Sequence, residues 1–415
     1  MNRMAHRRDV TDRGTLRWAV RHAYEGSPFH RARLDASGVD PDSVEAPADL
    51  RRLPFTTKDE LRQAQPFGWT CVPLDEVVRV HASTGTTGRR TISTYTAADL
   101  DDWAELFRRA LELAGVTKAD RCQLTPGFGL WSAGAGFQAG VERLGAMAIP
   151  TGPGNVDVQF EMMLEVGATM IAATSSFGLL LAEEARRRGL AGRLPLRIGV
   201  LGSERWGEGM RRQIEEGLGI ETFDLAGFTE LYGPGMAIDC RLHDGLHYWD
   251  DHYVVEIVDP ATGEALPPGQ EGEMVVTTLR KEAQPLLRYR TRDVTSLYAE
   301  PCPCGSRFPR HGRILGRTDD MFKVRGVQIF PAQIDSVLAA VAGTAGEYQV
   351  RLSRDGGRDR FLVRVEGEPA LGGELTDRLQ GALGVRPDVE VVAPGSLPRT
   401  ERKTQRVFDE RGERG

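Results

Sequence analysis

The stretch Ser-Thr-Gly-Thr-Thr-Gly-Arg-Arg-Thr, residues 83–91, decides the fold, and its composition is typical of a loop that binds an anion. Gly85 and Gly88 can adopt backbone angles that other residues avoid, so that consecutive N–H groups can turn toward one anion. Arg89 and Arg90 add positive charge. The hydroxyl groups that add further donors belong to Ser83, Thr84, Thr86 and Thr87. For this stretch alone, a flexible surface hairpin is the alternative interpretation.

Strand-like residues flank this loop on both sides. Val78, Val80 and Ala82 alternate along the chain before it, and residues 91–95 after it are mostly β-branched. The context is therefore strand–loop–strand. It differs from the nucleotide-binding loop Gly-x-x-x-x-Gly-Lys-Ser/Thr, which opens a helix.

Length and composition limit the class of protein. A chain of 415 residues predicts two or three lobes, and 40% hydrophobic with 27% charged residues is typical of a soluble globular protein. A net charge of −6, with both signs well mixed, argues against a general nucleic-acid surface. No apolar run is long enough to span a membrane, and residues 1–12 lack the apolar segment of a secretory signal. Five cysteines form no disulfide framework, so we expect a reducing cytosol.

Strands and helices alternate through the first half of the chain. Buried-looking strands are expected at residues 120–125, 146–150, 170–173, 198–201 and 221–224. Helical patterns lie at residues 97–114, 157–167, 176–188 and 207–217. This alternation predicts an α/β fold with a parallel sheet covered on both faces.

Later segments change in character. Residues 247–300 contain short β runs separated by turns, which predicts an antiparallel, β-rich subdomain. A smaller α+β module follows Arg317. We therefore expect an N-terminal domain over residues 1–316 and a mobile C-terminal domain over residues 317–415.

Carboxylates follow two of the expected strands. Residues 224–230 come directly after the strand at 221–224, where ligands bind in open α/β sheets. There Glu230 can hold Mg²⁺ with help from Thr229. Asp293 lies among arginines at 288–292, a setting that suits ribose hydroxyls beside phosphate. Alternatively, Glu230 is a solvated residue after a helix cap, and residues 288–293 are a charged strand edge.

Two polar segments lie near the C-terminus. Residues 316–326 form a polar stretch where the composition changes, as expected of a hinge. Residues 397–407 contain Lys403, whose compact charge can reach a reacting phosphate or carboxylate. A basic, solvated tail is the alternative for this second segment.

Cysteine and histidine residues form a candidate metal site in the β-rich region. Its members are Cys240, His247, Cys302 and Cys304. Three thiolates and one imidazole suit a closed, structural Zn²⁺ site. The spacing also allows His243 or His252 to take the place of His247, and the alternative is three unpaired cysteines with a surface histidine. Cys71 and Cys122 are expected in the core.

The order and spacing of five motifs resemble the AMP-forming adenylating superfamily, and within it the phenylacetate–CoA ligase-like branch. The resemblance runs from about residue 50 to the C-terminus. The motifs are residues 81–88 (His-Ala-Ser-Thr-Gly-Thr-Thr-Gly), 226–235 (Ala-Gly-Phe-Thr-Glu-Leu-Tyr-Gly-Pro-Gly), 290–293 (Arg-Thr-Arg-Asp), 316–320 (Gly-Arg-Thr-Asp-Asp) and 397–400 (Leu-Pro-Arg-Thr) leading to Lys403.

This resemblance implies a role for each position. Residues 83–88 would wrap the ATP phosphates, and Glu230 would hold Mg²⁺. The rest of the nucleotide site would comprise Gly202, Ser203, Glu204, Asp224, Asp293 and Arg317, with Asp293 on the ribose. Asp319 would be the hinge, and Lys403 would reach the substrate carboxylate and the α-phosphate. After rotation of the small module, residues 323–326 would line the pantetheine tunnel. Members of the branch with Cys and His at the four positions above bind zinc.

The implied reaction is ATP-dependent adenylation of an aromatic carboxylic acid, followed by transfer to coenzyme A. The expected acid pocket comprises Phe128, Trp131, Phe137, Ala226, Gly227 and Pro234, although each of these can equally be a packing residue. The expected partner is a small aromatic acid, with no nucleic acid and no membrane. A homodimer is plausible.

Three positions depart from the family pattern. Arg89-Arg90 stands where Lys-Pro is usual, Ala226 replaces a tyrosine that stacks on adenine, and Arg402 replaces a glycine. These changes leave adenylation intact but bear on the second half-reaction. The alternatives are a stand-alone aryl-acid adenylating enzyme that uses a carrier-protein thiol, an amine or another nucleophile, and a non-catalytic nucleotide sensor. Intact Lys403, Glu230 and Asp293 argue against the sensor.

Overall fold

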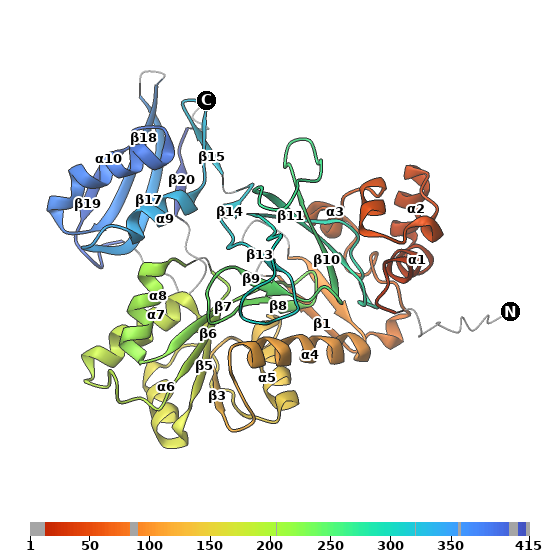
Figure 1. Ribbon diagram of the computed structural model, residues 1–415, viewed down its shortest axis with the longest axis horizontal. Coiled ribbons are helices and arrows are strands. Elements are labelled where there is room, and N and C mark those ends of the chain that lie inside the picture. Colours follow the sequence, from red (N-terminus) through yellow and green to blue (C-terminus); the bar gives the residue numbers. More distant parts are fainter. Residues whose placement is uncertain are drawn as a thin grey trace.

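The computed structural model describes residues 13–83, 90–204, 206–319, 321–355, 358–397 and 406–411. Figure 1 shows a large region built from the first three quarters of the chain and a smaller region from the last quarter. The helices are α1 Leu16–Gly26, α2 Pro28–Ser37, α3 Lys58–Gln63, α4 Ala97–Leu113, α5 Ala133–Leu144, α6 Val156–Met162, α7 Ser175–Arg187, α8 Glu208–Leu218, α9 Pro331–Ala339 and α10 Gly372–Leu383.

An eight-stranded sheet in the order β13-β9-β8-β7-β6-β5-β3-β4 organises the large region. Strands β3 to β7 pair in parallel, and β8, β9 and β13 extend the sheet antiparallel. The bounds are β3 Arg121–Leu124, β4 Met147–Ile149, β5 Met170–Thr174, β6 Ile198–Gly202, β7 Glu221–Phe228, β8 Gly233–Asp239, β9 Leu246–Tyr248 and β13 Arg310–His311. The expected α/β class with a parallel sheet is therefore confirmed.

Both faces of this sheet are covered because alternate residues of each strand enter different hydrophobic cores. On β5, Met170 and Ala172 pack in the core that contains the buried face of α4. Ile171 and Ala173 point the other way, into the core with α7 and α8. This is the period of two that strands impose. Figure 1 shows α4 and α5 on one side of the sheet and α7 and α8 on the other.

Strands β1 (Arg79–Ala82) and β2 (Ile92–Tyr95) form an antiparallel pair around the Gly/Thr-rich loop. Ser83 closes this pair, because its backbone N–H donates to the Thr91 carbonyl and its hydroxyl accepts from the Thr91 N–H, each at 2.9 Å. The expected strand–loop–strand context is confirmed on both flanks. The loop residues 84–89 lie outside the described residues.

The β-rich subdomain is a second, antiparallel sheet in the order β10-β11-β12-β14. Its strands are β10 Tyr253–Val258, β11 Gly272–Thr278, β12 Tyr289–Thr295 and β14 Gly316–Arg317. One expectation needs correction: β7 does not end at Asp224 but continues to Phe228. The reason is that β8 folds back along it and pairs with residues 225–228.

The last quarter of the chain has its own hydrophobic core. A hairpin of β15 (Phe322–Val324) and β16 (Val327–Ile329) leads into a sheet ordered β19-β18-β17-β20, against which α9 and α10 pack. These strands are β17 Thr344–Asp355, β18 Arg358–Gly367, β19 Asp388–Val392 and β20 Val407–Asp409. The region meets the large one where the Arg212 guanidinium donates to the Ala339 carbonyl at 3.5 Å.

Helix α2 gives a test of the fold. His30 is 2% exposed, and its imidazole packs edge-on against the Trp69 ring. Its Nε2 forms a hydrogen bond with the Pro285 carbonyl oxygen at 3.1 Å. Burial lowers the pKa of His30 from 6.5 to about 4. As the pH falls, His30 binds a proton in the unfolded chain before it does so in the folded protein. The free energy of unfolding should therefore decrease as the pH drops below about 6.5 and level off near pH 4.

We expect His30→Gln to remove this loss, which amounts to about 2 kcal/mol between pH 7 and pH 5. Urea midpoints of the wild type and the variant at both pH values measure it. Other titrating groups cancel in the difference between the two proteins. Equal shifts with pH in both proteins would contradict the assignment.

Candidate functional site at the strand ends of the large sheet

The residues expected to line the adenine site lie directly after the carboxyl end of β6 and at the same level on the neighbouring strand β7. Ser203, directly after β6, has a φ of +71°, a left-handed conformation that is uncommon for serine. Such strain is found at ligand sites more often than elsewhere. Glu204 accepts a hydrogen bond from the Ser176 hydroxyl at 2.7 Å, and burial raises its pKa.

Asp224 lies within β7, opposite Leu201 of β6. Its carboxylate accepts a hydrogen bond from the Trp206 indole at 3.0 Å. Burial, and then the negative charge of Asp239, raise the pKa of Asp224 to about 6. Asp224 is therefore a buried carboxyl group close to the place where the adenine site is expected.

Thr229 and Glu230 occupy the reversal between β7 and β8. Gly233, at the start of β8, has a φ of +128°, and an added Cβ would lie 2.7 Å from the Trp103 ring, so only glycine fits there. The Tyr95 hydroxyl, at the end of β2, lies 2.8 Å from the Tyr232 carbonyl and 3.4 Å from that of Thr229. The reversal is therefore held against the strand that leaves the Gly/Thr-rich loop.

The Glu230 carboxylate is buried and faces a cation. Glu230 is 4% exposed, and its Oε1 atom accepts no directed hydrogen bond from any described residue. The ammonium of Lys58, the first residue of α3, lies 2.8 Å from Oε1 and forms an ion pair with it. A buried carboxylate oxygen with unused lone pairs fits a hard cation such as Mg²⁺.

A second cation, Lys281, lies behind the same reversal and is fully buried. Its ammonium donates to the Ser93 hydroxyl at 2.8 Å and to the Leu231 carbonyl, with the Glu230 carbonyl at 3.4 Å. It also lies over the rings of Tyr95 and Tyr232, 4.5 and 5.3 Å from their centroids. Burial lowers the pKa of Lys281 to about 7, although the nearby carboxylates of Asp99 and Glu230 act in the opposite direction.

Three predicted residues form one chain of ion pairs. Asp293 of β12 and Arg317 of β14 lie directly opposite each other in the antiparallel sheet, and Arg317 Nη1 donates to Asp293 Oδ1 at 3.0 Å. The same guanidinium binds Asp319 through two hydrogen bonds, at 2.8 and 3.0 Å. Burial alone would raise the pKa of Asp319, but Arg317 and then Arg292 lower it.

The expected acid-pocket residues differ in exposure. Phe128 and Trp131 are about 40% exposed, whereas Phe137 is 4% exposed and packs on Phe107 with ring centroids 4.8 Å apart. Gly227 of β7 pairs with Pro234 of β8. Ala226, the position before Gly227, is partly buried. Lining of an acid pocket stays a prediction for all of these residues.

The four expected zinc ligands meet at one point. The ligand atoms of Cys240, His247, Cys302 and Cys304 all lie within 4.8 Å of one another. His247 Nδ1 faces the Phe308 carbonyl at 2.8 Å, which favours a proton on Nδ1 and leaves Nε2 free to bind a metal. Nε2 lies 3.4 Å from Cys304 Sγ. Neither His243 nor His252 belongs to this cluster, which decides between the alternatives that the spacing left open.

Residues 84–88 of the Gly/Thr-rich loop and Lys403 lie outside the described residues. Conversely, two cations of the site were not predicted from the sequence. Lys58 carries only the signature of a helix start, and Lys281 resembles any lysine in a charged turn, because their partners are distant in the chain.

Comparisons with known proteins agree on the relatives of this chain. The family model for the AMP-binding enzyme C-terminal domain matches residues 326–411. A phenylacetate–coenzyme A ligase of Escherichia coli strain K12 is 41% identical over 95% of this chain and 93% of its own length.

A crystal structure of 2-hydroxyisobutyryl-CoA ligase, in the postadenylation state with 2-HIB-AMP, is 32% identical, with a TM-score of 0.87 over 95% of this chain and 88% of the ligase. The same ligase with 2-HIB-AMP and CoA, in the thioesterification state, gives a TM-score of 0.72 over 98% and 90%. Sequence identity and coverage are nearly equal for these two structures of the ligase. The lower TM-score of the second structure therefore reflects a different arrangement of the parts of the ligase relative to one another.

The contacts of Lys281 give a prediction. Lys281→Met should leave the Glu230 and Leu231 carbonyls without their donor, a loss of about 1–3 kcal/mol confined to the segments that the ammonium joins. Amide hydrogen exchange should therefore speed up by roughly tenfold in residues 91–95 and 228–232, but not in β17 and β18.

Lys118→Met, which removes an exposed lysine of the same region, is the matched control and should change neither segment. Uniformly faster exchange throughout the large region would indicate general destabilisation and contradict the role of Lys281.

Proposed function

The chain belongs to the phenylacetate–coenzyme A ligase family of AMP-forming enzymes, and from this premise we propose that it adenylates an aryl or arylacetic acid and transfers the acyl group to coenzyme A. The observation that carries the proposal is 41% identity to a phenylacetate–coenzyme A ligase over 95% of the chain. The buried Glu230, which follows β7 of the large sheet, and the Asp293–Arg317 ion pair support it.

In the first half-reaction, a carboxylate oxygen of the acid attacks the α-phosphorus of ATP. A new P–O bond forms, the bond to the β-phosphate breaks, and pyrophosphate leaves with the electron pair. We assign Ser83 and residues 84–88 to the phosphates. The rest of the nucleotide site is assigned to Ser203, Glu204, Asp224, Asp293 and Arg317. Lys403 is assigned to the developing negative charge between the acid and the α-phosphate.

Glu230 and Thr229 are the residues that would hold Mg²⁺. The buried Glu230 Oε1, with no directed hydrogen bond from a described residue, supports this assignment. When bound, the ion would neutralise part of the phosphate charge. Lys58, which pairs with Glu230, brings a further positive charge to the same place.

In the second half-reaction, the thiol sulfur attacks the acyl carbon. A C–S bond forms, the C–O bond to AMP breaks, and the thiol loses its proton. We propose that the regions 1–316 and 317–415 rotate about Asp319 between the two steps. The different TM-scores of the two states of 2-hydroxyisobutyryl-CoA ligase support such a rearrangement.

The acid substrate is proposed to be aromatic because the related E. coli protein is a phenylacetate–coenzyme A ligase. The expected lining of aromatic and small residues, around Phe128, Trp131 and Gly227, suits a flat ring. Ala226, which is small where the family has a tyrosine, leaves room beside that ring.

The cluster of Cys240, His247, Cys302 and Cys304 is proposed to hold a structural Zn²⁺ ion. Three sulfur atoms and one nitrogen within 4.8 Å of one another fit this ion, and with four protein ligands no position stays open for a substrate. Bound zinc would cross-link the segment after β8 to the segment before β13.

One alternative keeps the first half-reaction and changes the acceptor to a carrier-protein thiol, an amine or another nucleophile. Arg402, in place of a glycine beside Lys403, is the feature that favours it. A homodimer stays a prediction, and a cytosolic location is proposed from the five free cysteines. No helix among the described residues has the length and apolar character that crossing a membrane requires.

Acid-dependent pyrophosphate release from ATP tests the proposal, across benzoic, aminobenzoic, hydroxybenzoic and phenylacetic acids, with and without coenzyme A. We expect release with one class of acid and a CoA thioester by mass spectrometry. Release without a thioester would favour the alternative acceptor. Absence of release with every acid would refute adenylation.

Lys403→Ala should slow pyrophosphate release by about two to three orders of magnitude, because it removes the charge that stabilises the reacting centre. Thioester formation from chemically prepared acyl-AMP should persist. Arg402→Gly, which restores the family residue beside an intact lysine, is the matched control for pyrophosphate release. Wild-type release in Lys403→Ala would remove that lysine from the site.

Zinc is tested by elemental analysis of the purified protein, with about one ion per chain expected. Cys302→Ser should lose it and melt about 5–10 °C lower, since a cross-link between two segments is lost. Cys122→Ala changes a buried cysteine outside the cluster and should keep the metal. Equal metal content in both variants would contradict the site.

A further inference from the structure

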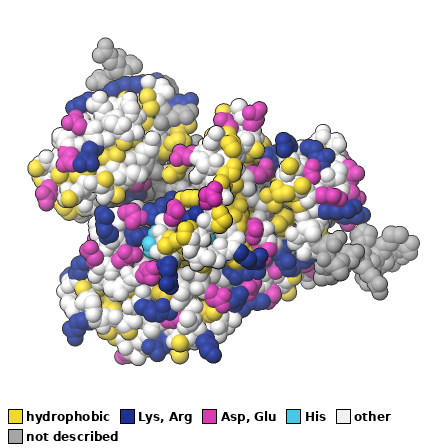
Figure 2. Space-filling view, in the orientation of Figure 1, with side chains coloured by type: hydrophobic (Ala, Val, Ile, Leu, Met, Phe, Trp, Pro, Cys, Tyr) yellow, Lys and Arg dark blue, Asp and Glu magenta, His cyan; other side chains and the backbone are white. Residues whose placement is uncertain are grey.

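The large region buries an ion pair between Arg211 of α8 and Asp239 of β8. On the face shown in Figure 2, charged side chains of both signs are mixed over the surface. Arg211 and Asp239 differ from these side chains, because they are only 5% and 2% exposed. Hydrophobic residues of similar size would stabilise a fold about as well as a buried ion pair does. The pair therefore points to a function beyond stability.

The Asp239 carboxylate joins Arg211 to the backbone of β7. Arg211 Nη2 donates to Asp239 Oδ2 at 2.9 Å, and His243 Nδ1 lies 2.9 Å from the same oxygen. Asp239 Oδ1 accepts from the backbone N–H of Asp224 at 2.7 Å. Both carboxylate oxygens are thus occupied, and the backbone of Asp224 is held from the neighbouring strand.

The Arg211 guanidinium also lies over the indole ring of Trp206, 4.7 Å from the ring centroid. The Trp206 indole N–H donates to Asp224 Oδ1 at 3.0 Å. Because a stacked guanidinium restricts how the ring can turn, it keeps this N–H directed at the carboxyl group. Arg211 therefore acts on Asp224 twice, on its backbone through Asp239 and on its side chain through Trp206.

The side chain of Asp224 retains one oxygen for a ligand. Phe223 and Leu225, its neighbours in β7, pack in the core that contains α4, so Asp224 points to the opposite face of the sheet. Among the hydrogen bonds between described residues, Asp224 Oδ1 accepts from the indole and Oδ2 accepts from none. An indole only donates, so its hydrogen bond favours the ionised carboxylate, whose second oxygen is an acceptor.

We propose that Trp206 and Arg211 are positioning residues that hold Asp224 as an acceptor for the exocyclic amino group of the nucleotide base, and thereby select a 6-amino purine over a 6-oxo purine. A 6-oxo purine presents a carbonyl oxygen at this place, and two acceptors would then face each other without a hydrogen between them. This inference rests on the proposed function, in which Asp224 belongs to the nucleotide site. It adds the residues that determine the choice of base.

The charges around Asp224 make its protonation sensitive to the indole. Burial, and then the negative charge of Asp239, raise the pKa of Asp224 to about 6, whereas the Trp206 hydrogen bond lowers it. The positive charges of Arg211, from α8, and of Arg313, from the segment between β13 and β14, also lower this pKa. Loss of the indole N–H should therefore raise the pKa of Asp224. A carboxyl group that has bound a proton can donate to a 6-oxo group, so the choice of base is then relaxed.

Acid-dependent pyrophosphate release with ATP and with ITP, whose base carries a 6-oxo group, tests the inference. Trp206→Phe keeps an aromatic ring beside Arg211 and removes the N–H donor. We expect the KM for ATP to rise roughly three- to tenfold at about pH 6.5, with the KM for ITP unchanged or lower. At about pH 8.5 the preference for ATP should largely return, because the ionised carboxylate then predominates in both proteins. The KM for the acid should be unaltered.

Arg211→Lys is a second variant. It keeps a positive charge beside Asp239 but lacks the planar group that stacks on Trp206, so it should also lower the preference for ATP. Trp18→Phe is the matched control, because it changes a tryptophan of α1, outside the nucleotide site, and should keep the preference of the wild type. Calorimetric titration with AMP and IMP gives a second readout that needs no catalysis.

Equal changes for ATP and ITP in Trp206→Phe at both pH values would overturn the inference, because a general loosening of the site affects both nucleotides alike. An unchanged KM for ATP in both variants, or a wild type that uses ATP and ITP equally well, would also overturn it. Absence of pyrophosphate release from the wild type with every acid would instead refute the proposed function. The titrations with AMP and IMP would then still measure the choice of base.

Discussion

The buried ammonium of Lys281 is the interaction on which the candidate site depends. It joins Ser93, the second residue of β2, to the carbonyls of Glu230 and Leu231. A charge with no exposed surface is costly unless every donor is used, and here hydroxyl, carbonyl and aromatic partners surround it. The strand after the Gly/Thr-rich loop and the β7–β8 reversal are thereby fixed to one another.

The Asp293–Arg317–Asp319 chain of ion pairs couples the proposed ribose-binding residue, Asp293, to the proposed hinge. One guanidinium cannot change its partners without affecting the carboxylates on both sides, since it binds Asp293 and Asp319 together. A ligand that competes for Asp293 therefore acts on the segment about which the small region is proposed to turn. The antiparallel pairing of β12 with β14 supplies the rigidity that this coupling needs.

Much of this molecule follows from local sequence, and the exceptions have physical causes. Alternating strands and helices predicted the parallel sheet. The start of α3 is also determined locally, because Thr57 and Glu60 form a capping box. The length of β7 was not predictable, because Ala226 and Gly227 have low β-propensity and become strand only through pairing with β8. Lys58 and Lys281 escaped prediction for a related reason. Each acts on residues at least 50 positions away, and only the fold brings them together.

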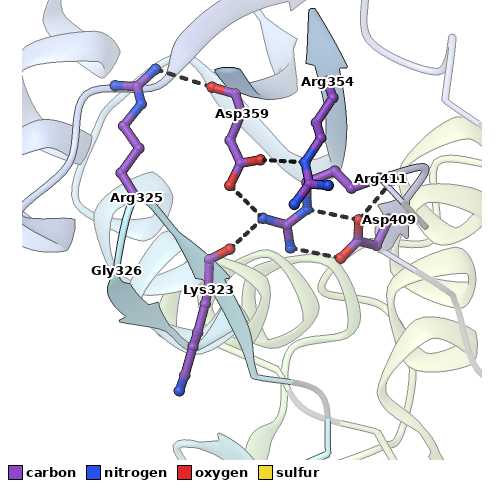
Figure 3. A pocket seen from close by; sticks show the side chains of 7 residues that line it. All are labelled: Lys323, Arg325, Gly326, Arg354, Asp359, Asp409 and Arg411. Atoms are coloured by element: carbon purple, nitrogen blue, oxygen red, sulfur yellow. Dashed lines mark hydrogen bonds and ion pairs between the residues drawn. The ribbon is translucent and has the colours of Figure 1, made fainter. Parts of the chain in front are cut away.

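The metal cluster shows the limit of spacing as evidence. Two pairs of Cys and His residues, more than 50 residues apart in the chain, predicted the four ligands. Only the structure excluded the competing histidines. His243 contacts Asp239 and Arg211 instead, and His252 contacts Asp251. The hydrogen bonds of Arg411 present the opposite case. Its guanidinium binds Asp359, Asp409 and the Lys323 carbonyl (Figure 3), and no local motif unites these residues.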